Sequence, residues 1–74
     1  MTSPELTRTT VDSSVLLSVA YSSDSTLELV FTSGAVYHYF SVPRVVLDGL
    51  LAAVSKGAYF NRNVRARFRH QRVA

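Results

Sequence analysis

Two stretches of alternating apolar and polar residues predict a pair of antiparallel strands, at about residues 15–21 and 26–32. Successive side chains of a strand point to opposite faces, so every second residue shares a face. The stretch between them, residues 22–25, has the Ser and Asp composition of a turn. One face of the two strands is expected to gather the apolar side chains Val15, Leu17, Val19, Tyr21, Leu27, Leu29 and Phe31.

A third strand is predicted after Ser33-Gly34, which reads as a two-residue hairpin turn. That turn would pair Phe31 with Val36, Leu29 with His38, and Leu27 with Phe40. His38 would then point into the apolar face, while Tyr37 and Tyr39 would lie on the opposite face with Glu28 and Val30. The first strand joins the apolar face only if the first loop has an odd length, which is either three residues (22–24) or five.

Two helices are predicted after Pro43, a residue suited to the first turn of a helix. The first carries an apolar stripe that should cover the sheet, at Val46, Leu47, Leu50, Leu51 and Val54. The segment Ser55-Lys56-Gly57 should end or bend it. A second helical pattern then separates an apolar stripe, Phe60, Val64 and Phe68, from a basic stripe, Arg62, Arg65, Arg69 and Arg72.

The expected fold class is therefore α+β, a three-stranded antiparallel β-meander followed by two α-helices, one of which covers the sheet. With 74 residues, such a domain buries only about 60% of its unfolded surface. There is no cysteine, and the two histidines are far apart, so we expect no disulfide, metal or cofactor. The first residues lack the apolar core of a signal peptide, and no apolar run could span a bilayer; we expect a cytoplasmic protein without membrane contact.

Charge is unevenly distributed along the chain. Residues 1–55 hold two arginines against five acids, a balance of −3, whereas residues 56–74 hold six basic residues and no acid, a balance of +6. A basic end on a near-neutral body is typical of a protein with an anionic partner. The alternative is a solvated basic surface that keeps a small protein soluble.

The order of several short motifs resembles the KTSC domain, a family named for a C-terminal domain of some lysyl-tRNA synthetases and also found as small free-standing proteins. The resemblance covers about residues 11–68 and rests on Val11-Asp12-Ser13-Ser14, Val19-Ala20-Tyr21, Leu27 to Phe31, Gly34, Tyr37-His38-Tyr39, Val42-Pro43 and Ser55-Lys56-Gly57-Ala58-Tyr59-Phe60-Asn61. We therefore expect a KTSC-like domain over residues 11–69. It should lie between a flexible leader (1–10), which is polar and without periodicity, and a flexible basic tail (70–74). The family's association with a synthetase suggests RNA binding, and it supplies no catalytic residue set.

The candidate nucleic-acid-binding residues are aromatic and basic: Tyr37, Tyr39, Lys56, Arg62, Arg65, Arg69 and Arg72. Aromatic rings on one strand face can stack unpaired bases, and arginines bind phosphate through two parallel hydrogen bonds. The structural alternatives are that the tyrosines pack beneath another element and that the arginines form a solvated face or dock an acidic protein.

Other chemistry is less well supported by these residues. Ser13 and Ser14 could be imagined as nucleophiles with His38, but no orienting acid accompanies them, and a role in the turn explains them better. The leading hypothesis is a non-enzymatic module that binds nucleic acid, chiefly RNA. The alternatives are a protein-interaction or self-assembly module, with a protein or a second copy as its partner, and a small-anion or nucleotide site beside Lys56 and Gly57.

Overall fold

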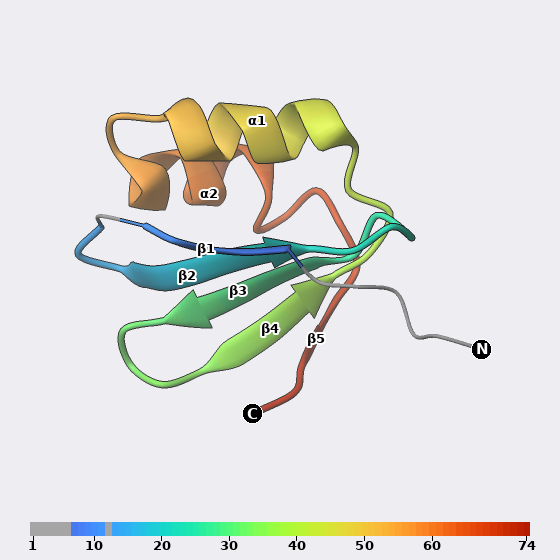
Figure 1. Ribbon diagram of the computed structural model, residues 1–74, viewed down its shortest axis with the longest axis horizontal. Coiled ribbons are helices and arrows are strands. Elements are labelled where there is room, and N and C mark those ends of the chain that lie inside the picture. Colours follow the sequence, from blue (N-terminus) through green and yellow to red (C-terminus); the bar gives the residue numbers. More distant parts are fainter. Residues whose placement is uncertain (1–6, 12) are drawn as a thin grey trace.

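Five antiparallel strands and two helices make up the computed structural model, which describes residues 7–11 and 13–74 (Figure 1). The strands are β1 (Thr7–Thr10), β2 (Leu16–Tyr21), β3 (Leu27–Phe31), β4 (Val36–Tyr39) and β5 (His70–Arg72), and they are ordered β1-β2-β3-β4-β5 across the sheet. The helices α1 (Arg44–Ala52) and α2 (Lys56–Asn63) lie on the same face. The α+β class and the two helices are confirmed, while the sheet has five strands instead of three.

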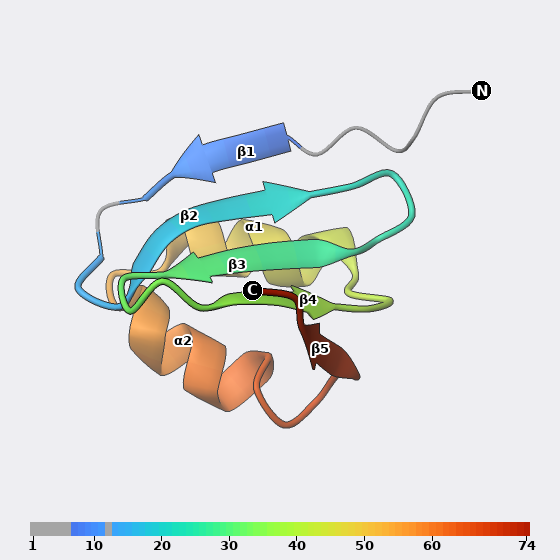
Figure 2. The ribbon, with the colours of Figure 1, turned by 90° about the horizontal axis from the view of Figure 1, so that it is seen from below.

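The two additional strands lie at the edges of the sheet, in segments where a leader and a tail were predicted. β1 lies within the predicted leader (1–10) and pairs with β2, and β5 lies within the predicted tail (70–74) and pairs with β4 (Figure 2). Residues 1–6 of the predicted leader fall outside the described residues. Pairing with β5 gives backbone partners to β4, whose outer edge would otherwise carry unpaired N–H and C=O groups.

The turn between β3 and β4 is one residue longer than predicted. Leu29 pairs with Tyr37 and Val30 with Val36, and the Phe31 amide donates to the Ala35 carbonyl at 2.9 Å. The loop is thus Thr32-Ser33-Gly34, and Gly34 adopts a φ of +96°, which favours glycine. Three-residue hairpin loops typically place such a residue last.

This one-residue difference moves every side chain of β4 to the other face. Tyr37 and Tyr39 therefore lie on the face that the helices cover, where Tyr39 is 3% exposed. His38 instead points to the opposite face, and its Nε2 lies 2.9 Å from Oε2 of the buried Glu28. The predicted orientations of these three β4 side chains were wrong.

A bulge also changes the expected pattern of β2. Leu16 pairs with Phe31 but Ser18 pairs with Val30, so Leu17 is an extra residue on its strand. Leu16 is fully buried, whereas Leu17 is 50% exposed and Val15 is 40% exposed, in contrast to the predicted alternation. The five-residue loop to β3, one of the two odd lengths expected, pairs Val19 with Leu29.

The hydrophobic core lies between the sheet and α1. Its buried side chains include Leu47 and Leu50 of α1 against Val19, Leu27 and Leu29. Figure 2 shows α1 behind β2 and β3, with α2 to the side of the sheet where β4 and β5 lie. Within the described residues, neither helix has the length and apolar character needed to cross a bilayer.

The helices are shorter than their sequence patterns suggest. α1 begins after Pro43 and ends at Ala52, so Val54 is fully exposed instead of completing the apolar stripe. Ser55 then begins α2, its hydroxyl accepting a hydrogen bond from the Ala58 amide at 3.3 Å. The second helix ends at Asn63, where the Arg65 amide turns back to the Phe60 carbonyl at 2.9 Å. Arg65, Arg69 and Arg72 therefore lie outside it, and the basic stripe on one helix was wrong.

Candidate nucleic-acid interface

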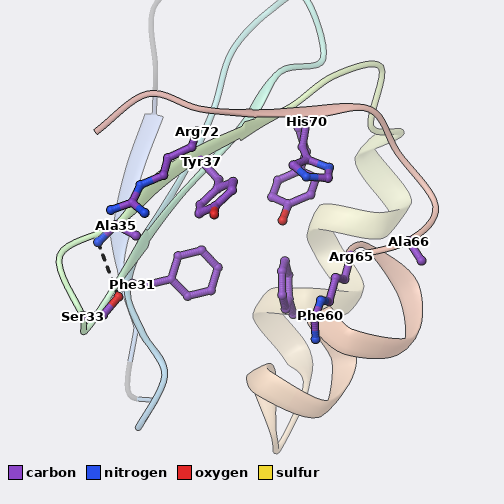
Figure 3. Close-up of a pocket in the computed structure, with 10 residues that line it drawn as sticks. Phe31, Ser33, Ala35, Tyr37, Phe60, Arg65, Ala66, His70 and Arg72 are labelled. Carbon is purple, nitrogen blue, oxygen red and sulfur yellow. Dashed lines mark hydrogen bonds between the residues drawn. The ribbon is translucent and has the colours of Figure 1, made fainter.

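An aromatic hollow opens between β4, β5 and the C-terminal end of α2. Its volume is about 610 Å³, within the range of about 300–1,000 Å³ typical of ligand sites. Strands, helix and the turn after α2 all contribute to its wall: Phe31, Ser33, Ala35, Tyr37, Tyr39, Phe60, Arg65, Ala66, His70 and Arg72. We call this site the aromatic hollow (Figure 3).

Ring contacts fix the positions of the aromatic side chains. Tyr37 and Tyr39 are two residues apart on β4, and their rings stack at 6.2 Å between centroids with 28° between planes. Phe60 meets Phe31 edge-on at 5.4 Å and Tyr39 edge-on at 5.7 Å. Such edge contacts suit the charge distribution of aromatic rings. The wall of the hollow is thus built of mutually packed rings.

Pairing between β4 and β5 adds polar groups to this aromatic wall. Tyr39 is opposite His70 and Tyr37 is opposite Arg72, so all four residues share one sheet face. The His70 ring lies 5.1 Å from the Tyr39 ring, with 33° between planes. Arg72 Nε donates to the backbone oxygen of Ala74 at 2.9 Å, which orients its guanidinium group.

The hollow has a positive rim. Figure 3 shows Arg72 on one side of the Phe31, Tyr37 and Phe60 rings and Arg65 on the other. Of the residues that the structure describes, no Asp or Glu lines it. Cations beside aromatic faces, without a carboxylate among these lining residues, suit an anionic ligand that has a planar group.

Tyr39 is the most deeply buried of the tyrosines in the wall. Burial raises the pKa of its hydroxyl above the ordinary value of 10.0; the neighbouring Tyr37 raises the pKa further, and the positive charge of Arg65 opposes both. Tyr37 is only half-buried and offers the more accessible ring.

Four of the seven predicted binding residues meet in this hollow, namely Tyr37, Tyr39, Arg65 and Arg72. The other three lie elsewhere. Arg62 is exposed on the last turn of α2. Lys56 donates to the Ala53 carbonyl at 2.9 Å, and Arg69 lines a second hollow beside Phe40.

Sequence reasoning missed three further ring-bearing residues of the wall, Phe31, Phe60 and His70. Phe31 and Phe60 were assigned to the core by their periodicity, and both do pack with core residues. His70 was placed in a tail because nothing local marks residues 70–72 as a strand. The signal that could have found it is the predicted strand at β4, because the backbone groups along its outer edge need a partner strand.

The remaining candidate groups lie away from the aromatic hollow. His38 and Glu28 pair on the opposite face of the sheet. Ser13 accepts backbone hydrogen bonds from Val15 and Leu16, as expected of a turn residue. The part of the chain that the structure describes holds no group of three or more His, Cys, Asp or Glu able to bind a metal.

Comparison with known proteins places the chain in a family. The KTSC domain matches residues 12–68. A protein of Tsukamurella paurometabola is 45% identical over 60 residues, which are 80% of this chain and 90% of that protein. A lysine–tRNA ligase of Trichormus variabilis is 40% identical over 53 residues, 72% of this chain but only 9% of the ligase.

A solved structure shares the whole architecture. The crystal structure of a KTSC domain protein from Yersinia pestis superimposes with a TM-score of 0.90 and 30% sequence identity. The match covers 95% of this chain and 100% of the other. This chain therefore shares its overall fold with that relative and belongs to the KTSC domain family.

Proposed function

We propose that this domain is a non-enzymatic module that binds single-stranded nucleic acid, and RNA in particular, at the aromatic hollow. The observation that carries the proposal is the joining of Tyr37 and Tyr39 with Arg65 and Arg72 in one wall. Rings provide faces for bases, and guanidinium groups provide charge and hydrogen bonds for phosphates. Neither group alone would indicate this ligand.

The concave shape favours an unpaired strand over a duplex. In a duplex both faces of each base are covered by neighbouring bases, so aromatic side chains reach bases chiefly in single strands and loops. A hollow of about 610 Å³ has room for one nucleotide unit. The half-buried Tyr37 ring is the face that we propose for stacking.

The charge of the surrounding segment supports an anionic partner. Residues 56–74 carry six basic side chains and no acid, and Arg65, Arg67, Arg69 and Arg72 are all exposed. The similarity to a lysine–tRNA ligase supports RNA as that partner. It covers a small part of the ligase, so we propose for this chain an RNA-binding role alone, without the ligase's activity.

The proposal is tested by titrating the protein into a short fluorescein-labelled oligouridylate and following anisotropy at about 50 and 200 mM salt. Arg65→Gln/Arg72→Gln should lower the affinity at least about tenfold, because each charge-assisted contact contributes about 1.5–3 kcal/mol. It should also reduce the salt slope by about 1.4 for two single-strand phosphates.

The matched control is Arg44→Gln/Arg62→Gln, which removes the same charge outside the hollow. If both double variants weaken binding equally, the attraction is general charge and the hollow is not the site. If unlabelled polyglutamate competes as well as oligouridylate and Tyr37→Leu changes nothing, the partner is an acidic protein. Absence of binding at the lower salt would reject the proposal outright.

A further inference from the structure

A second, smaller hollow lies where β4 leaves the sheet. It has a volume of about 350 Å³ and is lined by Phe40, Ser41, Arg67, Phe68 and Arg69. Backbone contacts hold its two walls together, because the Phe40 amide donates to the Arg69 carbonyl at 2.9 Å. Ser41, with a φ of +57°, turns the chain away from β4 toward α1.

The two hollows have one segment of the chain in common. Arg65, Ala66, His70 and Arg72 line the aromatic hollow, whereas residues 67–69 between them line the second hollow. The segment 65–72 therefore contributes lining residues to both hollows. A ligand that fills both must contact this segment.

The second hollow repeats the chemistry of the first. It pairs the half-buried rings of Phe40 and Phe68 with the exposed guanidinium groups of Arg67 and Arg69. Arg67 is oriented by a hydrogen bond from its Nε to the Arg62 carbonyl at 3.2 Å, which involves only the backbone of Arg62. Among the described residues, its lining also lacks Asp and Glu.

We propose that the second hollow holds another unpaired nucleotide of the same strand that occupies the aromatic hollow. The inference rests on the proposed function and extends it from one nucleotide to a strand that crosses the segment 65–72. Aromatic and cationic groups recur in both hollows, as expected for a binder of a chain of alternating bases and phosphates. Arg69, which the aromatic hollow leaves out, gains a role in this way.

The test compares binding of a long oligouridylate with that of the shortest oligouridylate that binds measurably. In the unchanged protein the long probe should bind more tightly, because it reaches both hollows. Arg67→Gln/Arg69→Gln should reduce the ratio of the two affinities at least about tenfold, the effect of losing one or more charge-assisted contacts to the second unit. The affinity of this variant for the short probe should stay within about twofold of that of the unchanged protein, since Arg67 and Arg69 do not line the aromatic hollow.

Arg44→Gln/Arg62→Gln removes the same charge outside both hollows and should leave the ratio unchanged. A ratio that is the same in the Arg67→Gln/Arg69→Gln variant and in the unchanged protein would overturn the second hollow as a subsite. An equal loss for both probes would overturn it as well. If instead Arg65→Gln/Arg72→Gln leaves both probes bound as before, the proposed function itself fails.

Discussion

The helix-covered face of the sheet is closed at one end and open at the other. Beneath α1, Leu47 and Leu50 pack on Leu27 and Leu29 and leave almost no exposed surface. Toward β5, the same face becomes the aromatic hollow, with arginines at its rim and a half-buried Tyr37. Adjoining residues of the same strands thus serve the core at one end and a proposed binding surface at the other.

The difference follows from how the two helices meet the sheet. α1 has nine residues and turns two buried leucines toward the strands. α2 has eight residues and buries only Phe60, followed by Val64 at its end. The chain then turns away to form β5, so the part of the sheet around β4 and β5 lacks a full helical cover. The hollow lies on this part of the sheet.

The largest expected effect is at the closed end. Leu50→Ala removes a fully buried side chain from beneath α1 and should lower the free energy of unfolding by about 2–5 kcal/mol, measured by urea denaturation. The matched change at the open end, Arg65→Gln/Arg72→Gln, should stay within about 0.5 kcal/mol because both arginines are exposed. A similar loss in the free energy of unfolding of the two variants would mean that the arginines at the rim of the hollow stabilise the fold.

A smaller effect is expected where the two helices touch. A Cβ at Gly49 of α1 would lie 2.7 Å from Cζ of Tyr59 and closer still to its hydroxyl. Gly49→Ala should therefore lower the free energy of unfolding by about 1–3 kcal/mol, the typical effect of overpacking. Because Tyr59 adjoins Phe60 of the hollow, the change should also weaken oligouridylate binding.

Tyr59→Ala provides the reference for this prediction. In its background, Gly49→Ala should become neutral or stabilising, since alanine favours a helix and the obstructing ring is gone. Urea denaturation of the four proteins measures the coupling. If Gly49→Ala lowers the free energy of unfolding by the same amount with and without the Tyr59 ring, the contact between the helices does not position α2.

The smallest effect concerns Tyr39, which lies between the closed and open ends. Burial raises the pKa of its hydroxyl above 10.0, so the unfolded chain loses this proton at a lower pH than the folded one. The resulting stabilisation is present below about pH 10 and is lost as pH rises through the folded pKa. Between about pH 9 and 11 the stability of Tyr39→Phe should fall less steeply than that of the unchanged protein. If the free energy of unfolding, measured by urea denaturation, falls with pH at the same rate in both proteins, the burial of this hydroxyl is contradicted.

Much of the fold could be predicted because its signals are local. The apolar face of residues 27–31, the helix after Pro43 and the odd length of the first loop all follow from periodicity and turn chemistry. The β3–β4 register could not be fixed in this way. Ser33-Gly34 fits a two-residue loop and the last two positions of a three-residue loop equally, and that choice decides which face Tyr37 occupies.

The candidate site depended on contacts between distant residues. Arg65 and Arg72 were selected as members of a helical stripe, yet they reach the hollow because the helix ends at Asn63 and β5 pairs with β4. Residues 60–72 have a helical pattern that is overridden by this pairing. His70 is opposite Tyr39 on the neighbouring strand, and nothing in the local sequence predicts this position.

The central claim, that the open end of this face binds a nucleic-acid strand while the closed end serves only as core, is tested most directly by NMR. Backbone amide shifts of ¹⁵N-labelled protein would be followed as oligouridylate is added. We expect changes concentrated at residues 35–41 and 65–72, with Arg44–Ala52 of α1 little affected. Changes centred on α1 or on the opposite face around Glu28 and His38, or no changes at all, would contradict it.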